Sequence, residues 1–293
     1  MRRQAFRSRL CRQPIRALTP VDVPGGSREH PAMSTPRHSL VLIPGLLCDA
    51  SVWPHQRAAL ADFADVTVSD HGLQDSLPGM ARTILANAPA RFAIAGHSMG
   101  GRIAFEVYRA APERISGVAL MDTGYHPLAL GAAGERERAG RFALLEIARR
   151  QGMRTMATQW VQGMVHPKRL SERALVDPIL DMFEAKSPEI YAAQTRALLD
   201  RPDAGPVMPT VRCPTLVLCG HEDSWSPVQR HLEMVAAIPG STFVDIPDCG
   251  HMCTLERPEA VSAAMRKWFL SVIASETAHA GAGVARAAGW AGK

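Results

Sequence analysis

From His38 onward, short runs of apolar residues alternate with longer stretches of mixed polarity. A strand that is buried on both faces of a sheet reads as a short continuous apolar run, so each run predicts such a strand. The longer stretches predict helices that cover a mostly parallel central sheet, which is the α/β class of fold. The predicted strands span residues 39–43, 65–69, 92–95, 116–121, 215–219 and 242–246.

The strand pattern is interrupted between residues 123 and 203. Helical periodicity replaces it over residues 134–151, 153–164, 171–186 and 187–200. At the start of the last of these helices, Ser187 is a suitable N-cap and Pro188 suits the first helical position. We therefore expect an all-helical cap over 123–203, inserted into a core formed by residues 38–122 and 204–276.

The two ends of the chain differ in composition from the part between them. Residues 1–37 form an Arg-rich extension that lacks the apolar centre of a secretory signal and loosely resembles an organelle transit peptide. We favour the simpler interpretation that Met33 is the working start, since the residues after it lead directly into the first strand. At the other end, a last helix is predicted over 256–274. Alanine and glycine dominate residues 277–293 without periodicity, which predicts a disordered tail.

Composition and charge narrow the function classes. The chain has 293 residues, 46% of them hydrophobic, and can bury a large core. No apolar run approaches the roughly 18 residues that span a bilayer, so we expect no membrane span. The net charge is +5, but residues 1–37 contribute +6, and the near-neutral remainder argues against a nucleic-acid partner. Six scattered cysteines without Cys-x-x-Cys spacing argue against structural zinc and favour a reducing, cytoplasmic setting.

The sequence Gly-His-Ser-Met-Gly at residues 96–100 stands between a predicted strand and a helical pattern over 102–111. Strand, turn and helix in this order predict a nucleophile elbow, in which a serine is exposed at a sharp turn. The turn is too crowded for side chains two positions before and after the serine, which explains Gly96 and Gly100. Ser98 is therefore the candidate nucleophile.

A serine hydroxyl needs a base to remove its proton and an acid to orient that base. His251 lies in a loop after the last predicted strand and is the candidate base. Asp223 follows the strand predicted at 215–219 and is the candidate acid. Asp122 also follows a strand and stays open as an alternative acid.

Four motifs, in a fixed order along the chain, carry a resemblance to a known family. They are Leu-Ile-Pro-Gly-Leu-Leu at 42–47, Gly-His-Ser-Met-Gly-Gly at 96–101, Gly-His-Glu-Asp at 220–223, and Gly-His-Met with Glu-Arg-Pro-Glu at 250–259. With these motifs the chain resembles the α/β-hydrolase fold superfamily, and more narrowly its small bacterial esterase-type members with a helical cap. The resemblance implies an α/β-hydrolase fold and a serine hydrolase that needs no cofactor and no metal.

The resemblance also implies a role for each candidate residue. Ser98 would attack the carbonyl carbon of a carboxylic ester and form an acyl-enzyme. His251 would act first as base and then as acid, while Asp223 holds it in the useful tautomer. The negative charge that develops on the carbonyl oxygen requires two main-chain N–H donors, which the resemblance assigns to Leu46 and Met99.

The substrate pocket is the part that the motifs describe least. Leu46, Trp160 and Met164 are apolar residues of the first loop and the cap, and we predict that they contact a small-molecule ester. The sequence shows no cluster of cations that demands a carboxylate substrate. Two other functions stay open: hydrolysis of a carbon–carbon bond or an enol-lactone in aromatic degradation, and non-catalytic binding of a small molecule on the same fold.

Removal of residues 1–32 is expected to leave stability and ester turnover nearly unchanged, because the predicted first strand begins after Met33. Thermal unfolding and a chromogenic short-chain ester assay, on the full chain and on a chain that starts at Met33, test this expectation. A truncated chain that is insoluble or inactive would contradict it.

Overall fold

A computed structural model describes residues 37–290 of the chain, with side chains up to residue 278. Apart from Arg37, the predicted extension lies outside the described residues, as do Met33 and residues 291–293. The described part contains one sheet of six strands in the order β2-β1-β3-β4-β5-β6. The strands are β1 (His38–Ile43), β2 (Ala64–Val68), β3 (Phe92–His97), β4 (Ile115–Met121), β5 (Thr215–Gly220) and β6 (Thr242–Ile246).

All neighbouring strands pair in parallel, as the apolar runs predicted. Every residue of β3, β4 and β5 is buried, whereas the residues of the edge strands β2 and β6 are mostly exposed or partly buried. This difference is expected of a sheet whose centre is covered on both faces. The chain runs outward from β1 to β2 and then returns to β3 on the other side of β1. Crevices outside the carboxyl ends of strands at such a reversal are where ligands bind in open α/β sheets.

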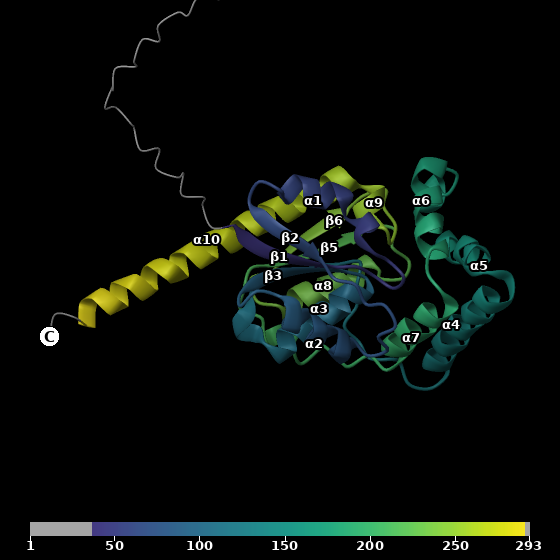
Figure 1. Ribbon diagram of the computed structural model, residues 1–293, viewed down its shortest axis with the longest axis horizontal. Coiled ribbons are helices and arrows are strands. Elements are labelled where there is room, and N and C mark those ends of the chain that lie inside the picture. The colour runs from purple at the N-terminus through teal and green to yellow at the C-terminus, as the bar shows by residue number, and fades with distance from the viewer. Residues whose placement is uncertain (1–36, 291–293) are drawn as a thin grey trace, which may run out of the picture. The chain divides into compact units, whose positions relative to one another are not determined.

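Helices cover both faces of the sheet (Figure 1). α1 and α10 lie against one face, and α2, α3 and α8 lie against the other. These helices are α1 (Pro54–Leu60), α2 (Leu77–Asn87), α3 (Met99–Ala110), α8 (Val228–Ala237) and α10 (Pro258–Trp290), with the short α9 (Cys253–Glu256) before the last. Short 3-10 helices lie at Ala50–Val52, Pro112–Arg114, Val161–Gly163, Pro167–Arg169 and Met208–Thr210.

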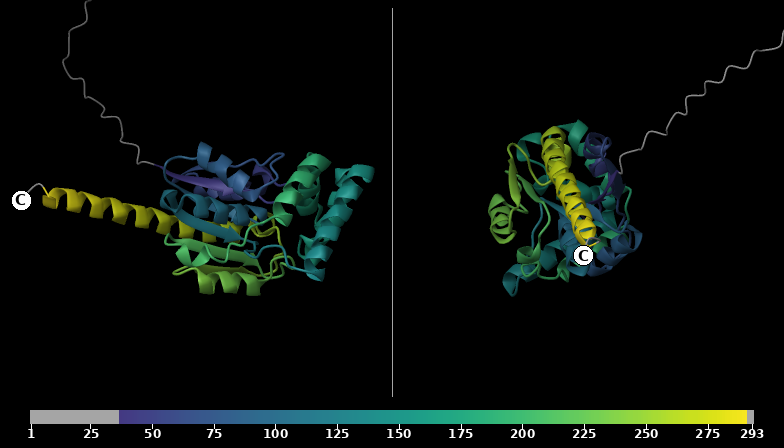
Figure 2. Two further views of the ribbon diagram at one scale, coloured as in Figure 1. Left: turned by 90° about the horizontal axis from the view of Figure 1, so that it is seen from below. Right: turned by 90° about the vertical axis from the view of Figure 1, so that its left-hand side faces the viewer.

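Four helices between β4 and β5 stand together at one end of the sheet, as Figures 1 and 2 show. They are α4 (Ala132–Gln151), α5 (Met153–Trp160), α6 (Arg173–Glu184) and α7 (Pro188–Leu199), and all fall within the predicted cap range. The predicted start of α7 is confirmed. Pro188 is its first residue, and the Ser187 hydroxyl accepts a hydrogen bond of 3.3 Å from the main-chain N–H of Ile190.

The last helix is longer than the sequence pattern predicted. α10 continues to Trp290, past the predicted end near Ala274, into the range predicted to be disordered. The extra residues are rich in alanine and contain no proline, and alanine has the highest intrinsic helix propensity, so the helix continues without an apolar stripe. None of the helices within residues 37–290 combines the length and the apolar character that a membrane crossing requires.

Candidate active site

Ser98 sits in the turn between β3 and α3, at the carboxyl edge of the sheet. Its backbone adopts φ 56° and ψ −117°, a conformation that residues with side chains rarely adopt and that costs about 1–3 kcal/mol. Two hydrogen bonds hold the turn: the Ser98 N–H donates to the Met121 carbonyl at 2.8 Å, and the Thr123 hydroxyl donates to the Ser98 carbonyl at 2.6 Å. Met121 is the last residue of β4 and Thr123 follows it in the next loop, so the end of the neighbouring strand and the loop after it fix the strained residue.

The glycines on either side of Ser98 are required by close backbone contacts. A Cβ atom on Gly96 would lie 2.3 Å from the Gly100 carbonyl oxygen, and one on Gly100 would lie 2.0 Å from the Ile43 carbonyl oxygen. Both distances are far below van der Waals contact, and the neighbouring atoms belong to the backbone. The crowding predicted for these two positions is therefore confirmed.

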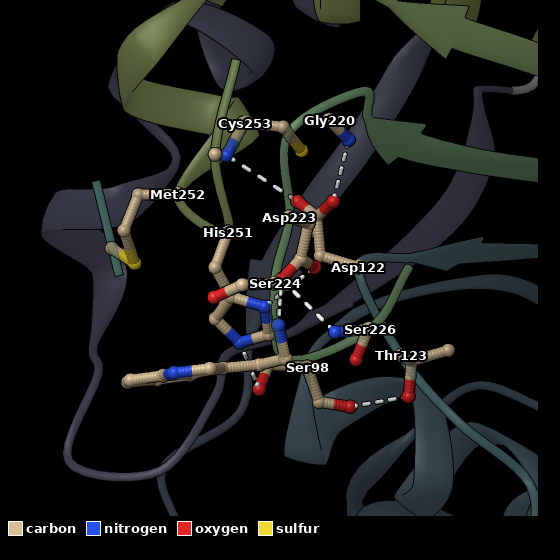
Figure 3. Close-up of polar contacts among 12 residues, drawn as sticks. Ser98, Asp122, Thr123, Gly220, Asp223, Ser224, Ser226, His251, Met252 and Cys253 are labelled. Carbon is tan, nitrogen blue, oxygen red and sulfur yellow. Dashed lines mark hydrogen bonds and ion pairs between the residues drawn. The ribbon is translucent and has the colours of Figure 1, made fainter. Parts of the chain in front are cut away.

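Three side chains from three different loops form one hydrogen-bonded series (Figure 3). The His251 Nε2 atom lies 2.8 Å from the Ser98 Oγ, and the His251 Nδ1 lies 2.7 Å from the Asp223 Oδ2. The other carboxylate oxygen of Asp223 accepts the main-chain N–H groups of Trp225 and Ser226 at 2.8 and 3.0 Å. A carboxylate acceptor requires a proton on Nδ1, so the Nε2 lone pair faces the serine hydroxyl.

Burial and charge shift the pKa values of Asp223 and His251 in opposite directions. Burial by itself would raise the pKa of Asp223, but the charge of His251 and its hydrogen bond, with those from Ser226 and Trp225, lower that pKa below its usual value. Burial would likewise lower the pKa of His251, but the charge of Asp223 and the bond to it raise that pKa above its ordinary value. The ionised carboxylate therefore stabilises a proton on the imidazole.

The alternative acid, Asp122, makes different contacts. Its Oδ1 accepts the Gly220 N–H at 2.8 Å and its Oδ2 accepts the Cys253 N–H at 3.3 Å, as Figure 3 shows. Within the described residues, Asp122 makes no hydrogen bond to His251. Its buried carboxylate joins the end of β5 to the start of α9 instead.

The main chain of His251 is held by groups that the sequence reasoning missed. Its carbonyl accepts a hydrogen bond of 2.7 Å from the His97 Nε2, and its N–H donates to the Met164 carbonyl of the cap at 2.8 Å. The buried carboxylate of Glu256 accepts the N–H groups of Gly250 and Met252 on one oxygen, both at 3.1 Å.

The other oxygen of Glu256 accepts the main-chain N–H of His166, in the cap, at 2.9 Å. One carboxylate therefore fixes both chain neighbours of His251 and a segment of the cap at the same time. Glu256 belongs to the Glu-Arg-Pro-Glu motif that marked the family resemblance, but the motif did not indicate this role.

Two main-chain N–H groups are candidates for binding a developing negative charge. Met99 is the first residue of α3, where the N–H groups have no partner within the helix and the helix dipole favours negative charge. Leu46 lies in the turn after β1. Within the described residues, neither N–H donates to a protein acceptor, and both residues line the same cavity as Ser98.

A cavity of about 870 Å³ lies beside Ser98 and His251. Leu46, Trp160 and Met164, the predicted substrate contacts, all line its wall. Trp225 is a further wall residue. Its ring stacks on Trp160 with centroids 5.6 Å apart and lies 4.9 Å from the His251 ring.

Not every apolar residue of the cap reaches this cavity. Met182 and Phe183 are buried but do not line it, and the Phe183 ring packs against Trp160 with centroids 5.1 Å apart. Phe183 therefore supports the Trp160 ring without lining the cavity itself.

One buried group of side chains has the composition of a metal site. His97, Asp122 and Cys253 offer ligand atoms within 4.8 Å of one another. His97 and Asp122 already have structural partners, however, since His97 donates to the His251 carbonyl and Asp122 accepts two N–H groups. Burial raises the pKa of the Cys253 thiol well above its usual value, so it lacks the thiolate that metals bind. The group fits a packed support for the loops better than a metal site.

Comparison with known proteins agrees with the fold expected from the motifs. The model of a family described as the alpha/beta hydrolase family matches residues 40–264. A Mycobacterium tuberculosis protein provisionally named a non-heme bromoperoxidase is 31% identical over 195 residues, which cover 63% of this chain and 70% of that protein.

Solved structures of similar proteins have the same overall fold. An esterase from Thermogutta terrifontis matches with a TM-score of 0.71 and 28% identity, covering 80% of this chain and 90% of the esterase. An enol-lactonase from Burkholderia xenovorans LB400 also has a TM-score of 0.71, at 22% identity, covering 81% of this chain and 93% of the lactonase. The second similarity shows the fold alone.

Replacement of Glu256 by glutamine is expected to destabilise the fold by about 1–3 kcal/mol, because the amide nitrogen must face one of the N–H donors that the carboxylate now accepts. Urea unfolding measures the loss. Glu259→Gln is the matched control, since the Glu259 side chain is 81% exposed and the substitution should cost less than about 0.5 kcal/mol. Equal stabilities of the two variants would contradict the role assigned to Glu256.

Proposed function

The chain belongs to the alpha/beta hydrolase family, and from this premise we propose that it cleaves carboxylic esters through an acyl-enzyme on Ser98. The observation that carries the proposal is the unbroken hydrogen-bonded series from Asp223 through His251 to Ser98 beside the cavity. A non-catalytic binding protein on this fold would not need three side chains from separate loops in contact.

In the proposed reaction, His251 takes the proton of Ser98 as the Oγ attacks the ester carbonyl carbon. The resulting imidazolium is stabilised by the ionised Asp223, which also keeps the reactive Nε2 directed at the serine. His251 then gives the proton to the departing alcohol, and the acyl group stays on Ser98. Water, activated by the same histidine, releases the acid and restores the hydroxyl.

The tetrahedral intermediate carries its negative charge on the former carbonyl oxygen. The N–H groups of Met99 and Leu46 are proposed to bind this oxygen, with the dipole of α3 adding to the stabilisation. These donors belong to the backbone of two fixed turns, so they need no rearrangement when the charge develops. Loss of one such donor typically lowers kcat by about 100- to 1000-fold.

The esterase similarity supports an ester substrate more than the other acyl compounds. The Thermogutta terrifontis esterase is 28% identical to this chain, whereas the enol-lactonase is similar in fold alone. An enol-lactone remains a second candidate, because a lactone is an internal ester and would pass through the same acyl-enzyme.

Ser98→Ala is expected to abolish turnover of a chromogenic short-chain ester and labelling by a fluorophosphonate probe, because both need the serine oxygen. The wild-type chain should show both reactions. Circular dichroism checks that the variant is folded. Equal ester turnover by the wild type and the variant would eliminate the serine mechanism, and a folded wild type that takes up no probe would favour the non-catalytic interpretation.

Asp223→Asn is expected to lower kcat by about 10⁴-fold, whereas Asp122→Asn should lose far less activity. The two variants also differ in pH dependence. His251 works as a base only when it is neutral, so kcat/KM should fall as the pH drops through the pKa of His251. Because that pKa is raised, the midpoint of this acid limb should lie above the ordinary histidine pKa of about 6.5. Loss of the Asp223 charge lowers that pKa and moves the limb to lower pH.

The measurement is kcat/KM against pH for the wild type and both variants. Asp122→Asn should keep its acid limb closer to that of the wild type, because Asp122 does not bond to the histidine. A severe rate loss confined to Asp122→Asn would overturn the assignment of the acid.

A further inference from the structure

The cavity beside Ser98 has one strongly cationic side. Its lining includes the side chains of Arg102, Arg136, Arg141, Arg201 and Arg230. These arginines come from α3, from α4, from the residues after α7 and from α8, so only the fold brings them together. Apolar side chains, among them those of Trp160 and Met164, form another part of the lining.

The acidic residues of the cavity pair with some of these arginines and, within the part of the chain that the structure describes, leave others without a carboxylate partner. Glu137 accepts Arg201 on both carboxylate oxygens, at 2.7 and 2.8 Å, and Arg141 at 2.9 Å. Asp122, the other lining acid, accepts main-chain N–H groups. Within the described residues, neither Arg102 nor Arg230 forms an ion pair with a carboxylate.

Arg102 and Arg230 are each tethered by one hydrogen bond. The Nη1 of Arg102 donates to the His126 carbonyl at 2.8 Å, and the Nη1 of Arg230 donates to the Trp225 carbonyl at 2.8 Å. The other nitrogens of these two guanidinium groups donate to no acceptor within the described residues. Burial, together with the nearby charges of Arg201 and Arg230, lowers the pKa of Arg102 to about 9.

The two tethered guanidinium groups converge on Gly124. A Cβ atom there would lie 2.7 Å from the Nη2 of Arg102 and 3.4 Å from the Nη1 of Arg230, so the two cations share the space that a side chain would fill. Gly124 follows Thr123, whose hydroxyl donates to the Ser98 carbonyl. Arg102 is four residues after Ser98, about 6 Å along the axis of α3. Arg102, Arg230 and Ser98 therefore line one cavity, and the two cations meet beside a residue whose neighbour holds the Ser98 turn.

We propose that the ester or lactone substrate carries a carboxylate a few bonds from the reacting carbonyl, and that Arg102 and Arg230 bind this carboxylate. This inference rests on the proposed ester hydrolysis and specifies its substrate class. The planar guanidinium forks match a carboxylate, and bonds between two charged partners are about twice as strong as neutral ones. The apolar part of the lining then contacts the uncharged part of the substrate.

The test compares two esters of equal chain length, 4-nitrophenyl hydrogen adipate and 4-nitrophenyl hexanoate, which differ in the distal carboxylate. Arg102→Met and Arg230→Met should each lower kcat/KM for the adipate ester by about 10- to 100-fold and change that for the hexanoate ester less than about twofold. Arg138→Met is the matched control, since Arg138 is exposed on α4 and does not line the cavity.

The ratio of the two kcat/KM values is the deciding quantity, because it does not depend on how much of a variant is folded. Arg102→Lys should keep part of the preference for the adipate ester over the hexanoate ester. High salt should weaken this preference in the wild type. An equal loss on both esters, or an unchanged ratio in both methionine variants, would overturn the proposal.

Failure of the proposed ester hydrolysis can be distinguished from failure of the proposed carboxylate site. If the wild type cleaves neither ester, calorimetric titration with adipate still measures the anion site. Adipate should bind the wild type and Arg138→Met with equal affinity and bind Arg102→Met about tenfold more weakly. Equal affinities for all three chains would overturn the anion site independently of the reaction.

Discussion

The backbone conformation of Ser98 is the constraint on which the rest of the site depends. A positive φ at a residue with a side chain is unfavourable, so it persists only where neighbouring structure imposes it. Here the end of β4 and the loop after it each supply one hydrogen bond to the turn, and the close contact of Gly100 with the end of β1 leaves no room for a side chain there. The buried centre of the sheet therefore provides the rigidity. The same turn directs the hydroxyl and the first N–H of α3 toward one cavity.

Three buried carboxylates near this turn do different work because their partners differ. Asp223 faces the imidazole, Asp122 joins two loops through main-chain N–H groups, and Glu256 fixes the residues beside His251. Asp122 and Asp223 follow the ends of strands, and Glu256 lies in the short helix α9. All three accept hydrogen bonds from residues 250–253, which include His251. The role of each carboxylate is therefore decided by the donor that it faces, because the carboxylate group itself is the same in all three.

The sequence allowed the sheet and the series of Ser98, Asp223 and His251 to be predicted because those features leave local patterns. Buried strands appear as apolar runs, and Ser98, Asp223 and His251 each lie in a short motif that follows a strand. The arginine side of the cavity leaves no such pattern, since Arg102 and Arg230 are far apart in the chain and meet only over Gly124. The hydrogen bonds of Glu256 likewise depend on the approach of the cap. The length of α10 was missed because alanine can extend a helix without an apolar stripe.

The hydrogen bond from the His251 N–H to the Met164 carbonyl joins the histidine loop to a segment that lines the cavity. Glu256 joins His166 of the same segment to the histidine loop. A cap that swung open as a rigid lid would have to break these bonds and would release the histidine each time. Any shift of residues 164–166 therefore also moves the loop that carries His251, so the wall of the cavity and the position of the histidine do not vary independently.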